Sequence, residues 1–190
     1  MVLNKIRGAI NPLLEKIGKY FSLIGAPAWG WTLFGLLLSL ISMSFYMTQE
    51  SSGALFGGIF FLLSGLMDII DGAVAKFTNT VSNLGSFIDS TADRLSEVLV
   101  CFGLLVGKWA PPDFIFLMVT FSILVSYVRA KGDSLGIDLK GSGIGERAER
   151  MIVLSLFSIV GYTFYGVLLV CALALFTFIE RSTVIMRKLK

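Results

Sequence analysis

The sequence predicts an all-α integral membrane protein with six transmembrane helices and an N-terminal amphipathic helix that lies in the membrane interface. Three observations lead to this class: 55% of the 190 residues are hydrophobic, only 15% are charged, and the mean hydropathy is +0.82. Soluble domains carry about 25% charged residues. Apolar runs that can cross about 30 Å of hydrocarbon as helices lie at 29–48, 53–75, 86–108, 112–131, 149–164 and 166–187.

Residues 1–22 form the first predicted element, a juxtamembrane amphipathic helix, and residues 23–190 form the six-helix domain. Apolar residues recur at helical spacing between Ile6 and Ile17, with basic residues around them. Such a helix lies in the plane of the interface. We expect Pro12 to break this helix or to mark its start. The segment lacks the apolar core and the cleavage site of a signal peptide, so we expect it to remain in the mature protein.

The boundary between the fifth and sixth spans is the least marked. Few polar residues separate these spans between Gly161 and Gly166. A count of six therefore requires a tight turn in this stretch, for which glycine is well suited.

Basic residues determine the predicted orientation. With six spans, the N-terminal helix, the turn at 76–84, the loop at 131–148 and the C-terminal tail share one side. Counting residues just inside the helix ends, that side holds fifteen of the sixteen Lys and Arg residues. The opposite side holds Lys108. Because Lys and Arg are retained on the cytoplasmic side, we expect a multi-pass protein of the cell membrane with both termini in the cytoplasm.

Composition also excludes several functions. The chain has no histidine, which excludes a histidine general base, a histidine zinc ligand and a histidine-dependent triad. Cys101 and Cys171 lie inside apolar spans, where cysteine behaves as a small hydrophobe, so we expect both to be inert. The basic residues are not interleaved with aromatic residues as in a nucleic-acid patch, and we expect no nucleic-acid partner.

Four aspartates at the ends of the second and third spans predict a metal site. Asp68 and Asp71 stand three residues apart, and Asp89 and Asp93 stand four apart, so each pair shares a helix face. A carboxylate at bilayer depth costs on the order of 2.5 to 3.5 kcal/mol on insertion scales, and cations are the expected compensation. Four aspartates from two antiparallel helices can hold two Mg²⁺ or Mn²⁺ ions about 3.5 to 4 Å apart, as in centres that handle phosphates.

Small residues accompany these aspartates. Gly72, Ala75 and Gly85 would let a bulky nucleotide approach the backbone closely. An aspartate that metal holds less firmly can take the proton from an attacking hydroxyl. Two other interpretations stay open. In the first, the aspartates pair with Lys and Arg as ordinary charges at the membrane boundary. In the second, they line an ion or proton pathway, which predicts acidic residues across the bilayer, and the midplane has none beyond Glu97.

The aspartates belong to a longer motif, DIIDGAVAK at 68–76 followed after eight residues by GSFIDSTAD at 85–93. It resembles the pattern DxxDGxxAR, eight residues, GxxxDxxxD of the CDP-alcohol phosphatidyltransferases, membrane enzymes that move a phosphatidyl group from a CDP-linked lipid to an alcohol. Every spacing matches, and Lys76 stands where the family usually has arginine. Lysine keeps the charge and loses the bidentate geometry toward phosphate.

The resemblance implies six spans with the active site at their cytoplasmic ends, and it implies roles for individual residues. Asp68, Asp71 and Asp89 would bind two divalent metal ions, and Asp93 would be the catalytic base that also touches metal. Members of the family are commonly homodimers. The implied CDP-lipid site consists of Asp68, Gly72, Ala75, Lys76, Ser82, Gly85 and Thr32.

Five basic residues near the cytoplasmic ends of the later spans predict where the acceptor binds. An acceptor that carries its own phosphate needs such a cluster, because Arg and Lys recognise phosphate by charge and by forked hydrogen bonds. Free inositol does not. The alternative is that any cytoplasmic loop gathers basic residues. The predicted acceptor-phosphate residues are Arg129, Lys131, Arg147, Arg150 and Arg181.

The same region refines the resemblance. The pairing of YVRAK at 127–131 with ERAER at 146–150 resembles the branch that makes phosphatidylinositol phosphate or archaetidylinositol phosphate from inositol 1-phosphate. We therefore expect transfer of a phosphatidyl or archaetidyl group to inositol 1-phosphate, with release of CMP. Glycerol 3-phosphate or another alcohol is the alternative acceptor, and a divalent-metal transporter is the alternative outside the enzymes.

Overall fold

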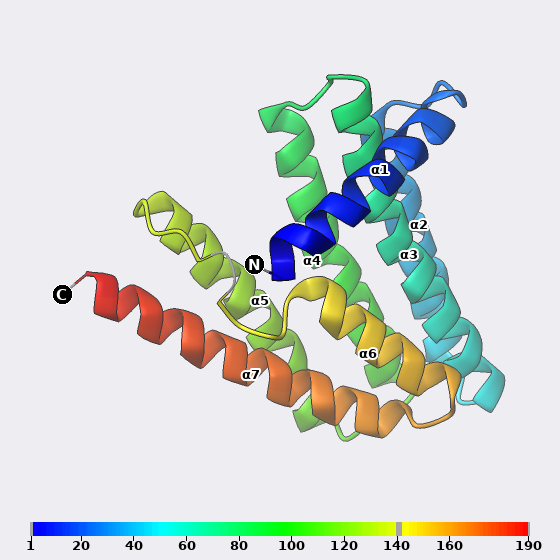
Figure 1. The fold of residues 1–190 in the computed structure, drawn as a ribbon. Helices are drawn as coiled ribbons and strands as arrows, with labels where there is room; N and C mark the ends of the chain where they lie inside the picture. Colours follow the sequence, from blue (N-terminus) through cyan, green and yellow to red (C-terminus); the bar gives the residue numbers. More distant parts are fainter. Residues whose placement is uncertain (1, 140–141, 190) are drawn as a thin grey trace. The chain divides into compact units, whose positions relative to one another are not determined.

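The computed structural model describes the backbone of residues 2–139 and 142–189 and the side chains of residues 12–139 and 142–189. The described residues form seven α-helices, and each predicted span coincides with one of α2 to α7 (Figure 1). The all-α class is therefore confirmed. The helices are α1 (Val2–Ser22), α2 (Ala28–Met47), α3 (Ser51–Phe77), α4 (Asn83–Val106), α5 (Pro112–Ser134), α6 (Arg147–Ile159) and α7 (Thr163–Lys188).

Helix α1 ends at the predicted boundary, and it runs through Pro12 without interruption. The expectation that Pro12 breaks or starts this helix is wrong, because a proline ring fixes φ at a helical value and removes only one backbone donor. Gly18 lies against α3, where an added Cβ would come within 2.5 Å of the Ala73 carbonyl oxygen. A glycine at this position therefore lets α1 dock closely on α3.

Within the described part of the chain, four helices are long and apolar enough to cross a membrane, namely α2, α3, α5 and α7. Helix α4 has 24 residues, but charged side chains occupy positions 89, 93, 94 and 97. Helix α6 has 13 residues, which at about 1.5 Å per residue is about 20 Å and falls short of the hydrocarbon core. The chain is thus a membrane protein with four candidate spans, and crossing by α4 and α6 stays a prediction.

The tight turn between the last two helices is present, slightly earlier than predicted. Helix α6 ends at Ile159 and α7 begins at Thr163. Gly161 has φ +83°, a left-handed conformation that stops a helix and that glycine adopts without strain. Gly166 lies inside α7 and faces α6, where an added Cβ would come within 2.8 Å of the Phe157 Cβ.

The chain divides into two compact units. The first unit comprises Met1–Leu38 and Leu63–Ser96, and the second comprises Ser39–Leu62 and Glu97–Lys190. Helices α2, α3 and α4 each contribute one part to each unit. The paired aspartates of the motif all fall in the first unit, and the five predicted acceptor residues all fall in the second.

The second unit contains the hydrophobic core. Its buried side chains include Tyr46, Leu104, Met118 and Val167, and both α5 and α6 pack on α7. The Trp109 indole Nε1 donates a hydrogen bond to the Tyr46 carbonyl oxygen at 2.6 Å. This bond ties the loop after α4 to the end of α2.

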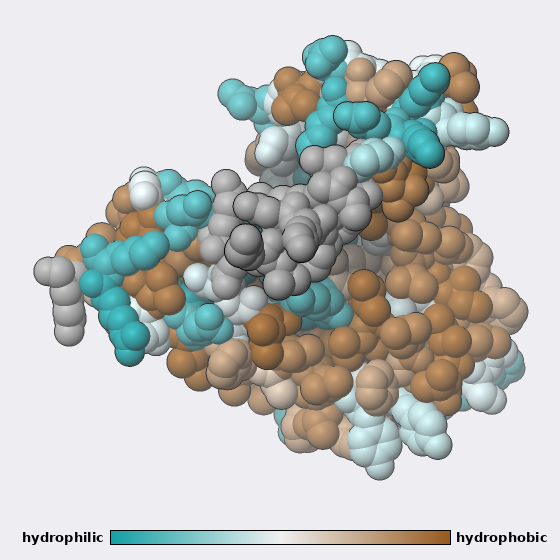
Figure 2. All heavy atoms as spheres, in the orientation of Figure 1, coloured by the Kyte–Doolittle hydropathy of each residue, from teal (hydrophilic) through white to brown (hydrophobic). Residues whose placement is uncertain are grey.

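Many large apolar side chains stay exposed along the helices. Examples are Leu33, Phe34 and Leu37 on α2, and Leu168 and Leu169 on α7. Figure 2 shows broad apolar areas on the visible face, with hydrophilic residues gathered toward helix ends. Exposed apolar surface of this extent is typical of helices that contact lipid.

Candidate functional site

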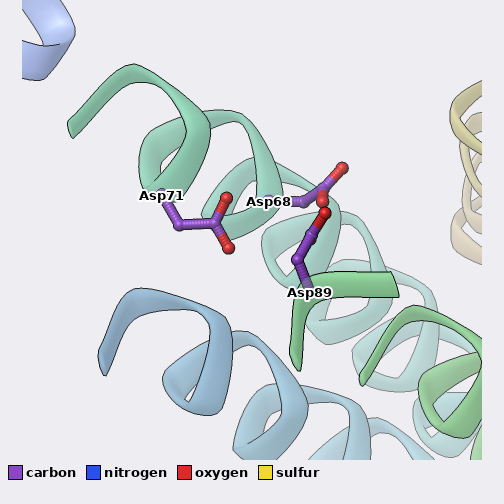
Figure 3. Close-up of side chains that lie close together, drawn as sticks. All are labelled: Asp68, Asp71 and Asp89. Carbon is purple, nitrogen blue, oxygen red and sulfur yellow. The ribbon is translucent and has the colours of Figure 1, made fainter. Parts of the chain in front are cut away.

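Three aspartates of the first unit converge. Asp68 and Asp71 lie near the end of α3, and Asp89 lies on α4 (Figure 3). One carboxylate oxygen from each lies within 4.8 Å of the others. Asp71 is buried, with 6% of its surface exposed. The helical spacing of three residues and the short turn to α4 bring the three groups together, as the sequence predicted.

The donor chemistry of this cluster fits a hard divalent cation. Mg²⁺ and Mn²⁺ prefer carboxylate oxygens, and three carboxylates in such proximity repel one another unless a cation lies among them. Thr32 on α2 donates a hydrogen bond from its hydroxyl to the Asp71 Oδ2 at 2.6 Å. Thr32, predicted as a CDP-lipid residue, thus also holds the buried carboxylate in place.

A cavity of ≈ 620 Å³ lies beside the aspartates in the first unit. Its lining brings together most of the predicted CDP-lipid site, and the Ser82 hydroxyl accepts a hydrogen bond from the Gly85 backbone N–H at 3.1 Å. The predicted site residues in the lining are Thr32, Asp71, Gly72, Ala75, Lys76, Ser82, Gly85 and Asp89. The lining at 25–28, from the loop before α2 and the first residue of that helix, was not predicted, because no sequence motif marks it.

Gly72 has no packing reason to be glycine. An added Cβ there would meet no described heavy atom within 4 Å. Glycine inside a helix costs roughly 1 kcal/mol relative to alanine. At Gly58, in the same helix, an added Cβ would instead lie 2.8 Å from the Ser155 carbonyl oxygen. The absent side chain at Gly72 therefore leaves this part of the cavity open, and the close approach of a nucleotide stays a prediction.

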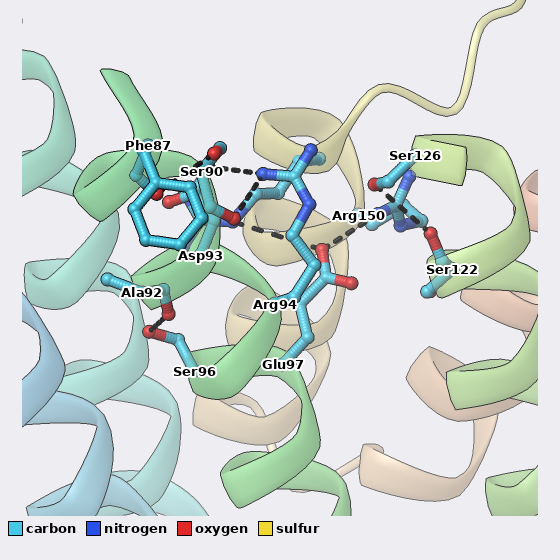
Figure 4. Close-up of polar contacts among 11 residues, drawn as sticks. Phe87, Ser90, Ala92, Asp93, Arg94, Ser96, Glu97, Ser122, Ser126 and Arg150 are labelled. Atoms are coloured by element: carbon cyan, nitrogen blue, oxygen red, sulfur yellow. Dashed lines mark hydrogen bonds and ion pairs between the residues drawn. The ribbon is translucent and has the colours of Figure 1, made fainter. Parts of the chain in front are cut away.

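Asp93 lies on α4, one turn beyond Asp89. Its Oδ2 is 3.4 Å from the Arg94 Nη1, which also donates to the Ser90 carbonyl oxygen at 2.7 Å (Figure 4). Asp93 does not belong to the three-carboxylate group found among the described residues. Its predicted roles as base and metal ligand stay predictions.

In the second unit, two predicted acceptor residues share one carboxylate. The Glu146 Oε1 lies 3.1 Å from the Arg181 Nη2 and 3.7 Å from the Arg129 Nη1. Arg181 is buried, and its Nε also donates to the Ser142 carbonyl oxygen at 3.0 Å. Arg129 is half-exposed, so an anion from solvent can reach it.

The other two predicted arginines, Arg147 and Arg150, pair with Glu97, which was not predicted as a site residue. The Glu97 Oε1 lies 2.7 Å from the Arg150 Nη2 and 3.9 Å from the Arg147 Nε. Arg150 is buried, with 3% of its side chain exposed. Lys131 is exposed near the end of α5. The available signal for Glu97 is its spacing, four residues after Asp93.

Comparison with known proteins gives a consistent picture. The family model for CDP-alcohol phosphatidyltransferase matches residues 28–179. The chain is 36% identical over 181 residues to an archaetidylinositol phosphate synthase of Pyrococcus horikoshii, covering 95% of this chain and 94% of that protein. It is 34% identical over 196 residues to the protein of the same name from Methanothermobacter thermautotrophicus, covering 100% and 96%. A phosphatidylinositol phosphate synthase of Mycobacteroides abscessus is 31% identical over 130 residues, covering 64% and 57%.

Solved structures share the fold. A Mycobacterium tuberculosis phosphatidylinositol phosphate synthase in complex with manganese and citrate superposes with a TM-score of 0.79 at 21% identity, covering 91% of this chain and 88% of that one. The same protein with CDP-DAG bound gives a TM-score of 0.76 at 21% identity, covering 92% and 94%.

Removal of the Thr32 hydroxyl tests the cation interpretation of the cluster. We expect Thr32→Val to weaken Mn²⁺ binding roughly ten-fold, because a carboxylate that loses its orienting hydrogen bond is a poorer ligand. Titration of the purified full chain with Mn²⁺, followed by electron paramagnetic resonance, measures this affinity. Ser44→Ala is the control, since the Ser44 hydroxyl on the same helix donates to the Leu40 carbonyl. Equal affinity in wild type and Thr32→Val contradicts the prediction.

Proposed function

Because the chain belongs to the CDP-alcohol phosphatidyltransferase family, we propose that it transfers the phosphatidyl or archaetidyl group of a CDP-linked lipid to inositol 1-phosphate and releases CMP. One observation carries the proposal for this site: three carboxylates lie within 4.8 Å of one another, beside a cavity lined by Gly72 and Gly85. The relatives that match nearly the whole chain are named for archaetidylinositol phosphate, which supports inositol phosphate as the acceptor.

Asp68, Asp71 and Asp89 would hold two divalent ions, Mg²⁺ or Mn²⁺, with Asp93 as a further ligand of the pair. Bound ions of this kind neutralise the oxygens of a diphosphate. Thr32 fixes Asp71 through its 2.6 Å hydrogen bond, so the buried ligand is in place before substrate arrives. The carboxylate set is thus preorganised by the protein itself.

The cavity would take the CDP part of the lipid. Gly72, Ala75 and Gly85 leave space for the nucleotide along the backbone, and Ser82 caps the start of α4 through its bond to the Gly85 N–H. Lys76 lines the same cavity and would meet the diphosphate as a point charge, without the forked contact of an arginine.

Asp93 would act as the general base. Its carboxylate takes the proton from a hydroxyl of inositol 1-phosphate, and the oxygen then attacks the phosphorus that bears the lipid. A new phosphorus–oxygen bond forms, the diphosphate bond breaks, and CMP leaves with the electron pair. General bases of this kind contribute about 10² to 10⁴ in rate.

The phosphate of the acceptor would bind at the basic residues of the second unit. Two guanidinium groups already converge on one anionic oxygen, that of Glu146, which supports an anion-binding role for this cluster. Free inositol would gain nothing from it. The proposed residues are Arg129, Lys131, Arg147, Arg150 and Arg181.

For the protein in its membrane, we propose six crossings, an interfacial position for α1, and both termini and the active site in the cytoplasm. The basic residues favour this orientation. We also propose a homodimer, as the family resemblance implies.

An acceptor panel tests the proposed function. CMP release is measured with the purified full chain, CDP-archaeol or CDP-diacylglycerol, and Mg²⁺ or Mn²⁺. We expect CMP with inositol 1-phosphate and none above background with free inositol. Faster release with glycerol 3-phosphate would identify a different acceptor, and metal flux in proteoliposomes without CMP release would indicate a transporter.

The general base has its own test. We expect Asp93→Asn to lower kcat about 10² to 10⁴-fold, because the amide cannot accept the hydroxyl proton. CDP-lipid binding, followed separately by isothermal titration, should remain measurable, since this change leaves the cavity lining and the three converging aspartates intact. Residual turnover near the wild-type rate would rule out Asp93 as the base.

Gly72 separates stability from substrate binding. We expect Gly72→Ala to raise thermal stability in detergent, by about 0.5 to 1 kcal/mol, because alanine favours the helix. The same change should raise the KM for CDP-lipid, since its methyl group enters the cavity. Gly58→Ala is the matched control and should destabilise the protein by about 1 to 3 kcal/mol through overpacking. An unchanged KM for CDP-lipid in Gly72→Ala would contradict the proposed position of the nucleotide.

A further inference from the structure

Glu97 is a buried carboxylate that bridges two helices of the second unit. It lies on α4 with 8% of its side chain exposed, and its Oε1 accepts a hydrogen bond from the Arg150 Nη2 at 2.7 Å (Figure 4). The Arg147 Nε forms an ion pair with the same oxygen at 3.9 Å. Both arginines belong to the first turn of α6. A buried charge that loses its partner strongly destabilises a protein. The start of α6 is therefore held against the residues of α4 around Glu97.

The buried guanidinium of Arg150 donates hydrogen bonds to two groups of the protein itself. Its second amino nitrogen, Nη1, donates to the Gly145 carbonyl oxygen at 2.6 Å. The cavity beside Arg150 and Glu97 measures only ≈ 20 Å³, which is room for a water molecule and not for a phosphate. Arg150 therefore joins Glu97 to the chain just before α6.

Side chains of α7 also bind the backbone of the segment just before α6. The Gly145 N–H donates to the Thr177 hydroxyl at 2.9 Å, and the Gly143 N–H donates to the Glu180 Oε1 at 3.1 Å. An added Cβ at Gly145 would come within 2.7 Å of the Leu173 carbonyl oxygen. The start of α6 is thus clamped between side chains of α4 and α7.

Glu97 also continues the stripe of carboxylates on α4. Asp89, Asp93 and Glu97 follow one another at intervals of four residues within one uninterrupted helix, so they lie along one helix face. A carboxylate one turn beyond the proposed base therefore contacts the two arginines in the first turn of α6, one of which is Arg147.

We infer that Glu97 is a positioning residue for the phosphate of the acceptor. It holds Arg150, and through the Arg150 bond to Gly145 it fixes the first turn of α6, where Arg147 binds the phosphate. Within the five proposed acceptor residues, Arg150 then has a different part from the others: its guanidinium bridges Glu97 and Gly145 and acts on the phosphate only through the position of Arg147. The inference rests on the proposed function and adds to it the contact that aligns the acceptor phosphate.

A simple electrostatic effect predicts the opposite result. If Glu97 were only a negative charge near an anion site, its removal would strengthen binding of the acceptor phosphate, because one repulsive charge disappears. A positioning role predicts weaker binding. The sign of the change in acceptor KM therefore separates the two effects.

The test uses Glu97→Gln in the full chain, which keeps the shape of the side chain and removes its charge. The change leaves Arg150 and Arg147, with 3% and 15% of their side chains exposed, without the counter-charge that holds them. We therefore expect the KM for inositol 1-phosphate to rise about ten-fold or more, because misplacement by about 1 Å costs up to 10²-fold. The KM for CDP-lipid should stay within about two-fold of wild type, since that site lies in separate residues. Glu149→Gln is the matched control. Glu149→Gln removes a negative charge from the first turn of α6. The glutamine oxygen can still accept the hydrogen bond that the Glu146 N–H donates to Glu149 at 2.9 Å.

Arg150→Lys gives an independent variant. Lysine keeps the charge but cannot reach Glu97 and Gly145 together with one forked group. We expect the same rise in acceptor KM as for Glu97→Gln, and no further rise in the double variant, because the two residues act as one bridge. Additive effects would overturn the inference.

Other outcomes are equally decisive. If the wild type uses inositol 1-phosphate and Glu97→Gln has a lower or unchanged KM for it, the inference is overturned and the proposed function stands. A wild type that uses no phosphorylated acceptor overturns the proposed function itself. If Glu97→Gln does not fold, Glu97→Asp and Arg150→Lys supply the same comparison, with thermal unfolding in detergent as the check on folding.

Discussion

Mutual repulsion among three carboxylates is the constraint on which the first unit depends. At a separation of about 5 Å and an effective dielectric constant of about 20, two such charges repel by on the order of 3 kcal/mol. The fold accepts this cost by placing Asp68 and Asp71 on one helix and Asp89 on the next, within 4.8 Å of one another. Thr32 holds the buried member, Asp71, from a third helix. Three helices therefore cooperate to hold together groups that repel one another.

The second unit shows the same physics with the signs reversed. Its arginines would repel one another and would be costly to bury, and each cluster is built around one carboxylate. Glu97 lies between Arg147 and Arg150, and Glu146 lies between Arg129 and Arg181. The two clusters differ in exposure, since Glu97 has 8% of its side chain exposed and Glu146 has 48%. The buried cluster therefore holds the start of α6 against α4, and the exposed cluster is open to an anion such as the proposed acceptor phosphate.

The aspartate cluster was predictable from the sequence because helix geometry converts spacing into position. Residues three and four apart share a face, and a short turn brings α3 and α4 together, so the motif was sufficient to locate Asp68, Asp71 and Asp89. The small residues that line the cavity followed from the same motif. The cavity wall at 25–28 was not predictable, because its residues are brought to the site by the chain path and carry no periodic signal.

The partners of the arginines were beyond the sequence for a different reason. A basic residue near a helix end predicts a charge that needs a partner, and it does not identify the partner. Arg150 looks like Arg129 in the sequence, yet Arg150 is buried between Glu97 and Gly145 while Arg129 is half-exposed. Likewise Pro12 looked like a helix breaker, and α1 continues through it, because the cost of one lost hydrogen bond is small against the packing of a long helix.

Stability and function make opposite demands on α3. Gly58 and Gly72 are both glycines in this helix, and only Gly58 is required by close packing, against the Ser155 carbonyl oxygen. Gly72 weakens the helix and leaves the space beside Asp71 empty. A sequence selected for stability alone would place alanine there. The open space beside the buried Asp71 therefore suits the ligand that we propose for this cavity, the diphosphate of a CDP-linked lipid.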